Sequence, residues 1–143
     1  MNRKAKIVIV DDHEMFREGM KLFIETEGIG EVVAEAENGQ QFLDILENHM
    51  PDLVIMDIEM PVMGGLEATT KAIAIRSYLK ILVLTLHCRK EDCNDLINAG
   101  VMGFVLKTSG KQELEKAIKT VIAGNKYFSD EQSNNIKINL LRQ

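Results

Sequence analysis

Short runs of consecutive apolar residues, each bounded by polar residues, recur along the chain. They occupy residues 7–10, 53–56, 81–84 and 104–106. Unbroken apolar runs of this length are typical of strands that are buried on both faces of a parallel sheet. Residues 32–36 form a fifth segment, which is less uniformly apolar and suits an edge strand.

Segments with helical periodicity separate these runs. They extend over residues 13–27, 39–48, 66–76, 90–100 and 110–124. We expect Phe16, Met20 and Phe23 on the buried face of the first helix, because they lie three and four residues apart. The alternation of strand and helix requires right-handed crossovers, and it predicts an open α/β sandwich.

Single residues indicate several helix and loop boundaries. Asn38 is the expected N-cap of the second helix. Ser109 begins a capping-box pattern before the last helix, and Gly124 ends that helix. In the loop after the third strand, Gly64 and Gly65 are the expected positions for positive φ.

The last residues of the chain, 125–143, differ from the rest. Ser129 begins a second capping-box pattern, and Ile136 and Leu140 share a helical face. This pattern predicts a short, weakly amphipathic helix, and a frayed terminus is the alternative. We therefore expect one folded domain over residues 1–124, followed by a linker or short helix.

The composition is that of an ordinary globular domain. The 143 residues are 45% apolar and 27% charged, and 17 basic against 22 acidic residues give a net charge of −5. This balance argues against direct binding to nucleic acid or to an anionic membrane. The apolar run near the N-terminus is too short for a signal peptide or a spanning helix, so we expect a cytoplasmic protein without membrane contact.

The two cysteines are too few for a disulfide framework or a structural zinc site. Cys88 and Cys93 lie five residues apart on a predicted helix, which places them on different faces. We therefore expect reduced thiols that do not pair, as is usual in the cytoplasm.

Polar residues follow four of the five predicted strands. Asp11 and Asp12 follow the first, Asp57 the third, Thr85 the fourth and Lys107 the fifth. Because the carboxyl ends of parallel strands share one edge of the sheet, these side chains should converge there.

Converging carboxylates need a cation, because two of them repel by about 4 kcal/mol at 4 Å. Oxygen ligands favour Mg²⁺, with Mn²⁺ as the alternative ion. Lys107 adds positive charge and Thr85 a hydrogen-bond donor, and both suit a phosphoryl group. Asp57 follows the strand that would be central, and its carboxylate is the natural nucleophile for an aspartyl phosphate.

With these residues, the chain resembles the receiver domain of two-component response regulators over residues 5–124. The matching motifs are Asp11-Asp12-His13 after the first strand, Asp57-Ile58-Glu59-Met60-Pro61 with Gly64-Gly65, Leu84-Thr85, Ala99-Gly100, and Gly103-Phe104-Val105-Leu106-Lys107. The resemblance implies a flavodoxin-like (CheY-like) doubly wound (βα)5 sandwich, with a five-stranded parallel sheet in the order 2-1-3-4-5.

The resemblance also implies roles for the acidic residues and the lysine. Asp57 would accept a phosphoryl group from a phosphohistidine on a sensor histidine kinase, and Lys107 would contact a phosphoryl oxygen. Asp12 would bind Mg²⁺ directly and Asp11 largely through water. The backbone carbonyl of Glu59 would supply a further metal ligand.

Thr85 and Phe104 would form the switch. Thr85 would turn toward the phosphoryl group, and Phe104, at a position where the family often has Tyr, would move from partly exposed to buried. His87 would be a neighbour of the phosphoryl pocket, and the side chain of Glu59 would influence the approach of water. We do not expect His13 or His87 to bind metal.

Other features are similar to the NarL/FixJ branch, whose members carry a C-terminal helix-turn-helix DNA-binding domain. Lys107 is followed by Thr108-Ser109 where many receivers have Pro, and residues 124–129 resemble the start of that branch's linker. The sequence ends at Gln143 without such a domain. We favour a fragment of a transcription regulator over a receiver that acts alone. Such a regulator would dimerise on phosphorylation and reach DNA only through its output domain.

Two alternatives come from other classes. A haloacid-dehalogenase-like phosphatase also uses an aspartate nucleophile, a hydroxyl and a lysine, but it usually has a second Asp two residues later, where this chain has Glu59. A pseudo-receiver would serve only as a dimerisation module. The favoured interpretation is a switch that catalyses only its own phosphorylation and dephosphorylation, without multiple turnover.

Overall fold

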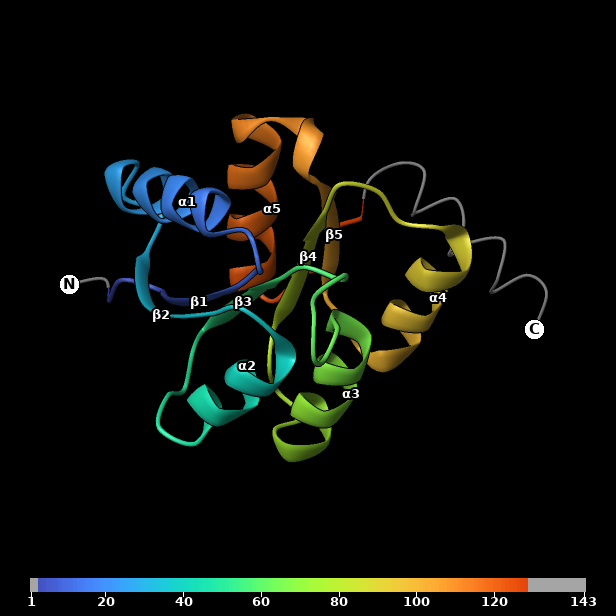
Figure 1. The fold of residues 1–143 in the computed structure, drawn as a ribbon. Helices are drawn as coiled ribbons and strands as arrows, with labels where there is room; N and C mark the ends of the chain where they lie inside the picture. Colours follow the sequence, from blue (N-terminus) through green and yellow to red (C-terminus); the bar gives the residue numbers. More distant parts are fainter. Residues whose placement is uncertain (1–2, 129–143) are drawn as a thin grey trace.

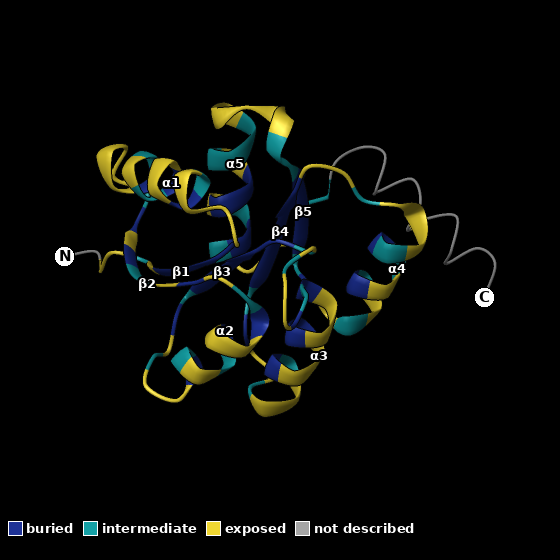
Figure 2. Ribbon diagram, in the orientation of Figure 1, coloured by how far each residue is buried: buried dark blue, intermediate teal, exposed yellow. Residues whose placement is uncertain are grey.

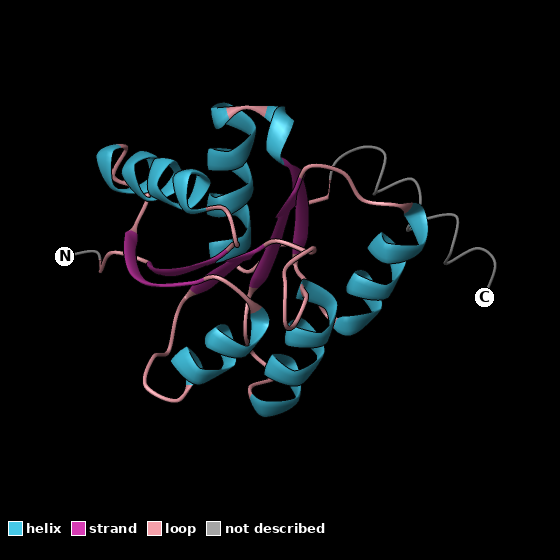
Figure 3. Cartoon of the chain, in the orientation of Figure 1, coloured by secondary structure: helices cyan, strands magenta, loops and turns pink. Residues whose placement is uncertain are grey.

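The computed structural model describes residues 3–128 and contains one parallel sheet (Figures 1 and 3). The strands are β1 (Lys6–Val10), β2 (Glu31–Ala36), β3 (Leu53–Met56), β4 (Ile81–Thr85) and β5 (Gly103–Leu106). The helices are α1 (Glu14–Thr26), α2 (Gly39–Leu46), α3 (Gly65–Ile75), α4 (Lys90–Ala99) and α5 (Lys111–Ile122). The strand order β2-β1-β3-β4-β5 confirms the predicted doubly wound fold.

Helices cover both faces of the sheet: α1 and α5 lie on one face, and α2, α3 and α4 on the other (Figure 1). Successive side chains of a strand point to opposite faces, so each strand contributes to two cores. In β1, Ile7 and Ile9 pack toward α1 and α5, while Val8 and Val10 pack on the other side. The strands are buried along most of their length (Figure 2), which explains their unbroken apolar runs.

The helix boundaries agree with the sequence in some places only. The Asn38 side chain accepts a hydrogen bond from the Gln41 backbone N–H at 2.9 Å, which confirms the predicted N-cap of α2. The capping box predicted at Ser109 is wrong. Residues Lys107–Ser109 form a 3-10 turn, and Gly110, with φ of 92°, is the N-cap of α5.

The buried face of α1 is rotated from its predicted position. Met20 is buried as expected, but its buried partners are Arg17 and Ile24, while Phe16 and Phe23 are half-buried. A charged residue on the inner side of the helix was not expected from hydrophobic periodicity. Arg17 is accommodated there because its guanidinium donates to the Asp11 carbonyl after β1 and to the Glu35 carboxylate in β2.

The segment after α5 extends the sheet at its β5 edge. Tyr127 forms a parallel bridge with Gly103. The Phe104 backbone N–H donates to the Tyr127 carbonyl, and the Tyr127 N–H donates to the Met102 carbonyl, both at 2.9 Å. A Cβ on Gly103 would lie 2.5 Å from the Tyr127 carbonyl oxygen, so this close approach requires glycine. The helix predicted around Ile136 and Leu140 lies outside the described residues.

The prediction that the two cysteines do not pair is wrong. The structure joins Cys88 and Cys93 in a disulfide, with their Cα atoms 6.0 Å apart. The prediction failed because it placed both residues on one helix. Cys88 precedes the α4 N-cap, Arg89, and so lies in the loop, whereas Cys93 is the fourth residue of α4.

Candidate functional site

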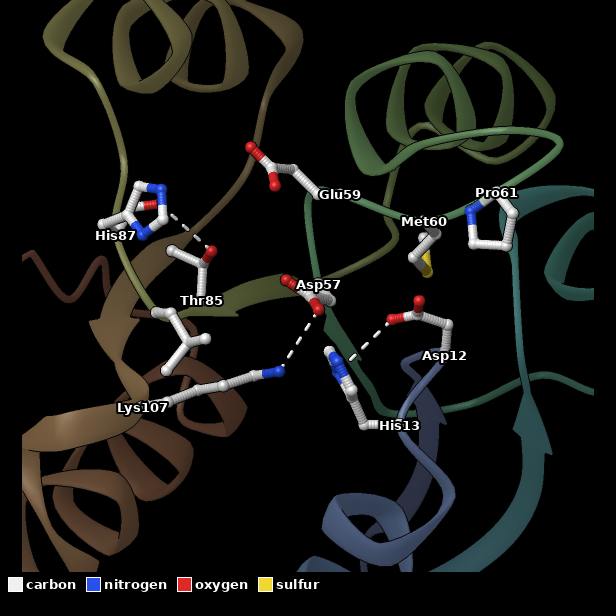
Figure 4. Close-up of a pocket in the computed structure, with 10 residues that line it drawn as sticks. Asp12, His13, Asp57, Glu59, Met60, Pro61, Thr85, His87 and Lys107 are labelled. Carbon is white, nitrogen blue, oxygen red and sulfur yellow. Dashed lines mark hydrogen bonds and ion pairs between the residues drawn. The ribbon is translucent and has the colours of Figure 1, made fainter.

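The register of the sheet brings the predicted polar residues to one edge. Val10 pairs with Met56, so Asp11 and Asp57 follow neighbouring strands at the same level, and the Asp57 N–H donates to the Val10 carbonyl at 2.9 Å. Thr85 pairs with Leu106, so Lys107 emerges beside it. A cleft of about 420 Å³ opens at this edge of the sheet (Figure 4). It is lined by Asp12, His13, Asp57, Glu59, Met60, Pro61, Thr85, Leu86, His87 and Lys107.

Lys107 lies between two carboxylates. Its Nζ is 2.7 Å from Asp11 Oδ2 and 3.2 Å from Asp57 Oδ2, and all three side chains are buried. The same Nζ lies 4.3 Å from the centre of the Phe16 ring, a cation–π contact that adds to its placement. Burial lowers the pKa of Lys107, but the hydrogen bond to Asp11 and the charges of Asp57 and Asp11 outweigh it and raise the pKa above its ordinary value.

The Asp57 carboxylate accepts hydrogen bonds from the backbone N–H of Ile58 and from the Lys107 ammonium group. Its Oδ1 accepts a hydrogen bond from the Ile58 N–H at 2.7 Å. Burial, and then the negative charge of Asp11, raise the pKa of Asp57, although Lys107 opposes the shift. The carboxylate therefore sits in a poorly hydrated place at the centre of the cleft, with one ammonium group as its cationic partner.

The two residues after β1 have different surroundings. The Asp11 carboxylate is almost fully buried and accepts the His13 N–H at 2.8 Å. The Asp12 carboxylate is 30% exposed and lines the cleft. The His13 Nδ1 lies 3.1 Å from Asp11 and 3.4 Å from Asp12.

The donor set suits a hard divalent cation. Oxygens of Asp11, Asp12 and Asp57, with a ring nitrogen of His13, all lie within 4.8 Å of one another. Three carboxylates beside an open cleft are the oxygen-rich environment that Mg²⁺ prefers, with room for water and phosphate oxygens. His13 also reaches this cluster, although the sequence did not favour it as a ligand.

The loop after β3 depends on glycine for space and not, as predicted, for positive φ. Gly64 has φ of −80° and Gly65 is helical, whereas Val62 has φ of 68°. A Cβ on Gly65 would lie 2.3 Å from the Asp57 carbonyl oxygen. The N-terminus of α3 therefore packs directly against the backbone of Asp57, and the preceding loop presents the Glu59 side chain to the cleft (Figure 4).

In this structure the Thr85 hydroxyl is bonded to the loop that follows β4. Its hydroxyl donates to the His87 carbonyl at 3.2 Å, as the dashed line in Figure 4 shows. Phe104 lies on the same side of the sheet and is only 1% exposed, which corrects the expectation of a partly exposed ring. The ring is covered by Phe128, whose ring centre is 6.2 Å away.

Sequence reasoning missed Arg17. Its guanidinium donates to the Asp11 carbonyl and lies 3.3 Å from the Glu35 carboxylate. It therefore ties the residue that follows β1 to strand β2. The sequence does contain a signal for it, because Arg17 lies three and seven residues before Met20 and Ile24 and so shares their helix face.

Residues 7–119 match the response regulator receiver domain family. The chain is 36% identical over 133 residues to the transcriptional regulatory protein DegU of Brevibacillus brevis, covering 93% of this chain and 56% of that protein. It is 36% identical over 126 residues to the response regulator GacA of Pseudomonas aeruginosa, covering 87% and 58%. The chain thus spans a little over half the length of these relatives.

Solved structures give the same result. A LuxR-family two-component response regulator from an Aurantimonas species superposes with a TM-score of 0.88 at 33% identity, covering 96% of this chain and 99% of that chain. The receiver domain of the response regulator NarL from Mycobacterium tuberculosis gives a TM-score of 0.78 at 31% identity, covering 87% of this chain and 100% of that chain.

In the described part of the chain, no helix is both long and apolar enough to cross a membrane.

Proposed function

Because the chain belongs to the response regulator receiver domain family, we propose that Asp57 accepts a phosphoryl group from a phosphohistidine of a sensor histidine kinase. One observation carries the proposal. The Asp57 carboxylate faces an open cleft at the end of the central strand, and the Lys107 ammonium group lies 3.2 Å from it.

In the proposed reaction, a carboxylate oxygen of Asp57 attacks phosphorus. A P–O bond forms to the carboxylate, and the P–N bond to the histidine breaks, with the electron pair leaving on the imidazole nitrogen. Lys107 opposes the rise in the pKa of Asp57 that burial and Asp11 cause, and it would then stabilise the charge on the phosphoryl oxygens. Phe16 and Asp11 hold the ammonium group in place.

Asp11, Asp12, Asp57 and the backbone carbonyl of Glu59 are the proposed ligands of Mg²⁺, with Mn²⁺ as the alternative. The clustered carboxylate oxygens support this assignment. The ion, when bound, would neutralise negative charge of the three carboxylates that Lys107 cannot balance alone. Asp12 is the most exposed of the carboxylates and is the proposed direct ligand, with Asp11 acting largely through water.

The proposed switch begins at Thr85. A phosphoryl group on Asp57 attracts the Thr85 hydroxyl, which must then leave the His87 carbonyl. Thr85 and Phe104 lie on the same side of the sheet, so this rotation alters the packing of Phe104 and the surface of α4 and α5. Glu59 and His87 line the cleft, where they would influence the approach of water and the lifetime of the acyl phosphate.

The proposed output is transcription regulation through a separate DNA-binding domain, with residues 125–143 leading toward it. This is supported by relatives that are named transcriptional regulators and are longer than this chain. The net charge of −5 also suits a receiver that reaches DNA only through another domain. We further propose that phosphorylation promotes a homodimer and that the protein acts in the cytoplasm, as is typical of the family.

Labelling with acetyl phosphate and Mg²⁺ tests the proposal. We expect one added phosphoryl group, about 80 Da by intact mass, in the wild type and none in Asp57→Asn. Asp52→Asn, a change to another carboxylate near the opposite end of β3, is the control and should label normally. Full labelling of Asp57→Asn would exclude Asp57 as the acceptor.

A second measurement separates the switch from a phosphatase. Sustained release of phosphate from phosphomonoesters would favour the haloacid-dehalogenase-like alternative, whereas labelling with a single turnover supports a receiver. Membership of the receiver domain family over residues 7–119 favours the switch.

A further inference from the structure

The two cysteines of the chain meet beside the cleft, at a place that the proposed phosphorylation does not explain. Cys88 and Cys93 are joined in the structure, and their Cα separation of 6.0 Å lies within the usual range of disulfides. Cys93 is 3% exposed and belongs to the core that contains Phe104. Cys88 is half-buried in the loop between β4 and α4, so solvent reaches the pair from that side.

The position of this pair couples it to Thr85. Cys88 directly follows His87, whose carbonyl accepts the Thr85 hydroxyl and whose side chain lines the cleft (Figure 4). A covalent bond from Cys88 to Cys93, the fourth residue of α4, therefore restrains the same loop that Thr85 must release to turn toward Asp57. Figure 1 shows this loop between the end of β4 and the start of α4.

We propose that Cys88 and Cys93 form a reversible thiol–disulfide site, and that the disulfide holds the β4–α4 loop in the conformation in which Thr85 bonds to His87. Oxidation then opposes the activated conformation, and reduction permits it. The effect on activation rests on the proposed function of Asp57, whereas formation of the disulfide does not.

The chemistry requires a small disulfide such as oxidised glutathione. The Cys88 thiolate attacks one sulfur of glutathione disulfide, and one glutathione thiolate leaves. The Cys93 thiolate then attacks the Cys88 sulfur of this mixed disulfide and expels the second glutathione. The protein loses two hydrogens, and two molecules of glutathione thiol are formed. In reducing compartments, disulfides of this kind are usually transient and redox-sensing.

The first test is equilibration of the full chain in glutathione redox buffers, followed by acid quenching and intact mass. We expect a reversible conversion between dithiol and disulfide, with the mixed disulfide as a minor species. Cys88→Ser and Cys93→Ala should each show no intramolecular conversion. Two free thiols in the wild type at every buffer ratio would overturn the proposal.

The second test measures loop order without any phosphoryl chemistry. Amide hydrogen exchange of residues 86–90 should be slower in the oxidised than in the reduced wild type, and unaffected by oxidant in Cys88→Ser. Equal exchange in both forms would show that the disulfide does not restrain the loop, and would overturn the proposal. Because Cys88 is only half-buried, its serine variant should remain folded.

The third test uses beryllofluoride, a mimic of the phosphoryl group, with Mg²⁺. We expect reduced protein to bind it at least about fivefold more tightly than oxidised protein, and beryllofluoride to shift the glutathione equilibrium toward the dithiol by the same factor. Equal affinities would overturn the coupling. If reduced protein accepts no label from acetyl phosphate and binds no beryllofluoride, the proposed function fails, while the first two tests still decide whether the thiol pair is a reversible site.

Discussion

The rings of Phe104 and Phe128 lie 6.2 Å apart, so a residue beyond the last helix covers the proposed switch position. The backbone bonds between Tyr127 and β5 hold this cover in place. A change in the packing of Phe104 would therefore reach Phe128 and the segment that is bonded to β5.

Removing the Phe128 ring should expose Phe104 and lower stability. We expect Phe128→Ala to reduce the free energy of unfolding by at least about 1 kcal/mol, because the aromatic pair alone contributes on this scale and the buried apolar area of the ring is lost as well. Urea titration measures this effect. Tyr78→Ala removes an aromatic side chain that is 64% exposed, and it should change stability by less than about 0.5 kcal/mol. Equal losses in the two variants would contradict a covering role for Phe128.

Phe104 should couple the cleft to self-association. Alanine at this fully buried site would cost about 3–5 kcal/mol, so leucine is the informative substitution. We expect beryllofluoride with Mg²⁺ to increase dimerisation of the wild type in sedimentation experiments, and Phe104→Leu to weaken that response. An undiminished response in the variant would rule out Phe104 as the coupling residue.

The raised pKa of Asp57 predicts a pH-dependent stability. Burial, and then the charge of Asp11, raise this pKa, so the folded protein binds the proton more readily than the unfolded chain. The resulting stabilisation is present at low pH and is lost as pH rises from the ordinary aspartate pKa through the raised value. At neutral pH the ionised carboxylate therefore destabilises the protein.

Asp57→Asn should accordingly increase the free energy of unfolding at pH 7 by about 1 kcal/mol in the absence of divalent ions. The gain should vanish below about pH 3, where the wild-type carboxyl is protonated in both states. Urea unfolding across this range measures it. Asp95→Asn, at an exposed position of α4, should show no such trend. A gain that is independent of pH would exclude ionisation as its cause.

Mg²⁺ should stabilise the protein through Asp12. At ten times the dissociation constant, the gain in unfolding free energy is about 1.4 kcal/mol. Asp12→Ala should reduce this response and raise the stability of the metal-free protein, because it removes one charge from the acidic cluster. Thermal melting with and without Mg²⁺ checks both effects, and an unchanged response in Asp12→Ala would place the metal elsewhere.

Gly65 should be needed for the position of Asp57. A Cβ at this residue would lie 2.3 Å from the Asp57 carbonyl oxygen, so Gly65→Ala must displace the backbone of the acceptor. We expect a loss of about 1–3 kcal/mol in stability, together with slower labelling by acetyl phosphate. In the control, Gly19→Ala, the new Cβ meets nothing within 4 Å inside α1, and it should stabilise the protein by about 0.5–1 kcal/mol. Similar behaviour of both variants would contradict the steric argument.

The sequence by itself determined the fold and the edge at which the polar residues meet. Buried parallel strands leave unbroken apolar runs, and the carboxyl ends of such strands lie together whatever packs around them. Asp11, Asp57, Thr85 and Lys107 were therefore predictable neighbours before any contact was known. Asn38 was predictable for a similar reason, because an N-cap bond joins residues three apart.

Only the tertiary structure decided which partners these residues have. The two oxygens that flank Lys107, the burial of Arg17 beneath the end of β1, and the cover of Phe128 over Phe104 all join different elements. The path of the loop between β4 and α4 likewise decided that Cys88 reaches Cys93. Such contacts depend on the rotation of each helix and on the path of each loop, and hydrophobic periodicity restricts neither closely enough to place a single side chain.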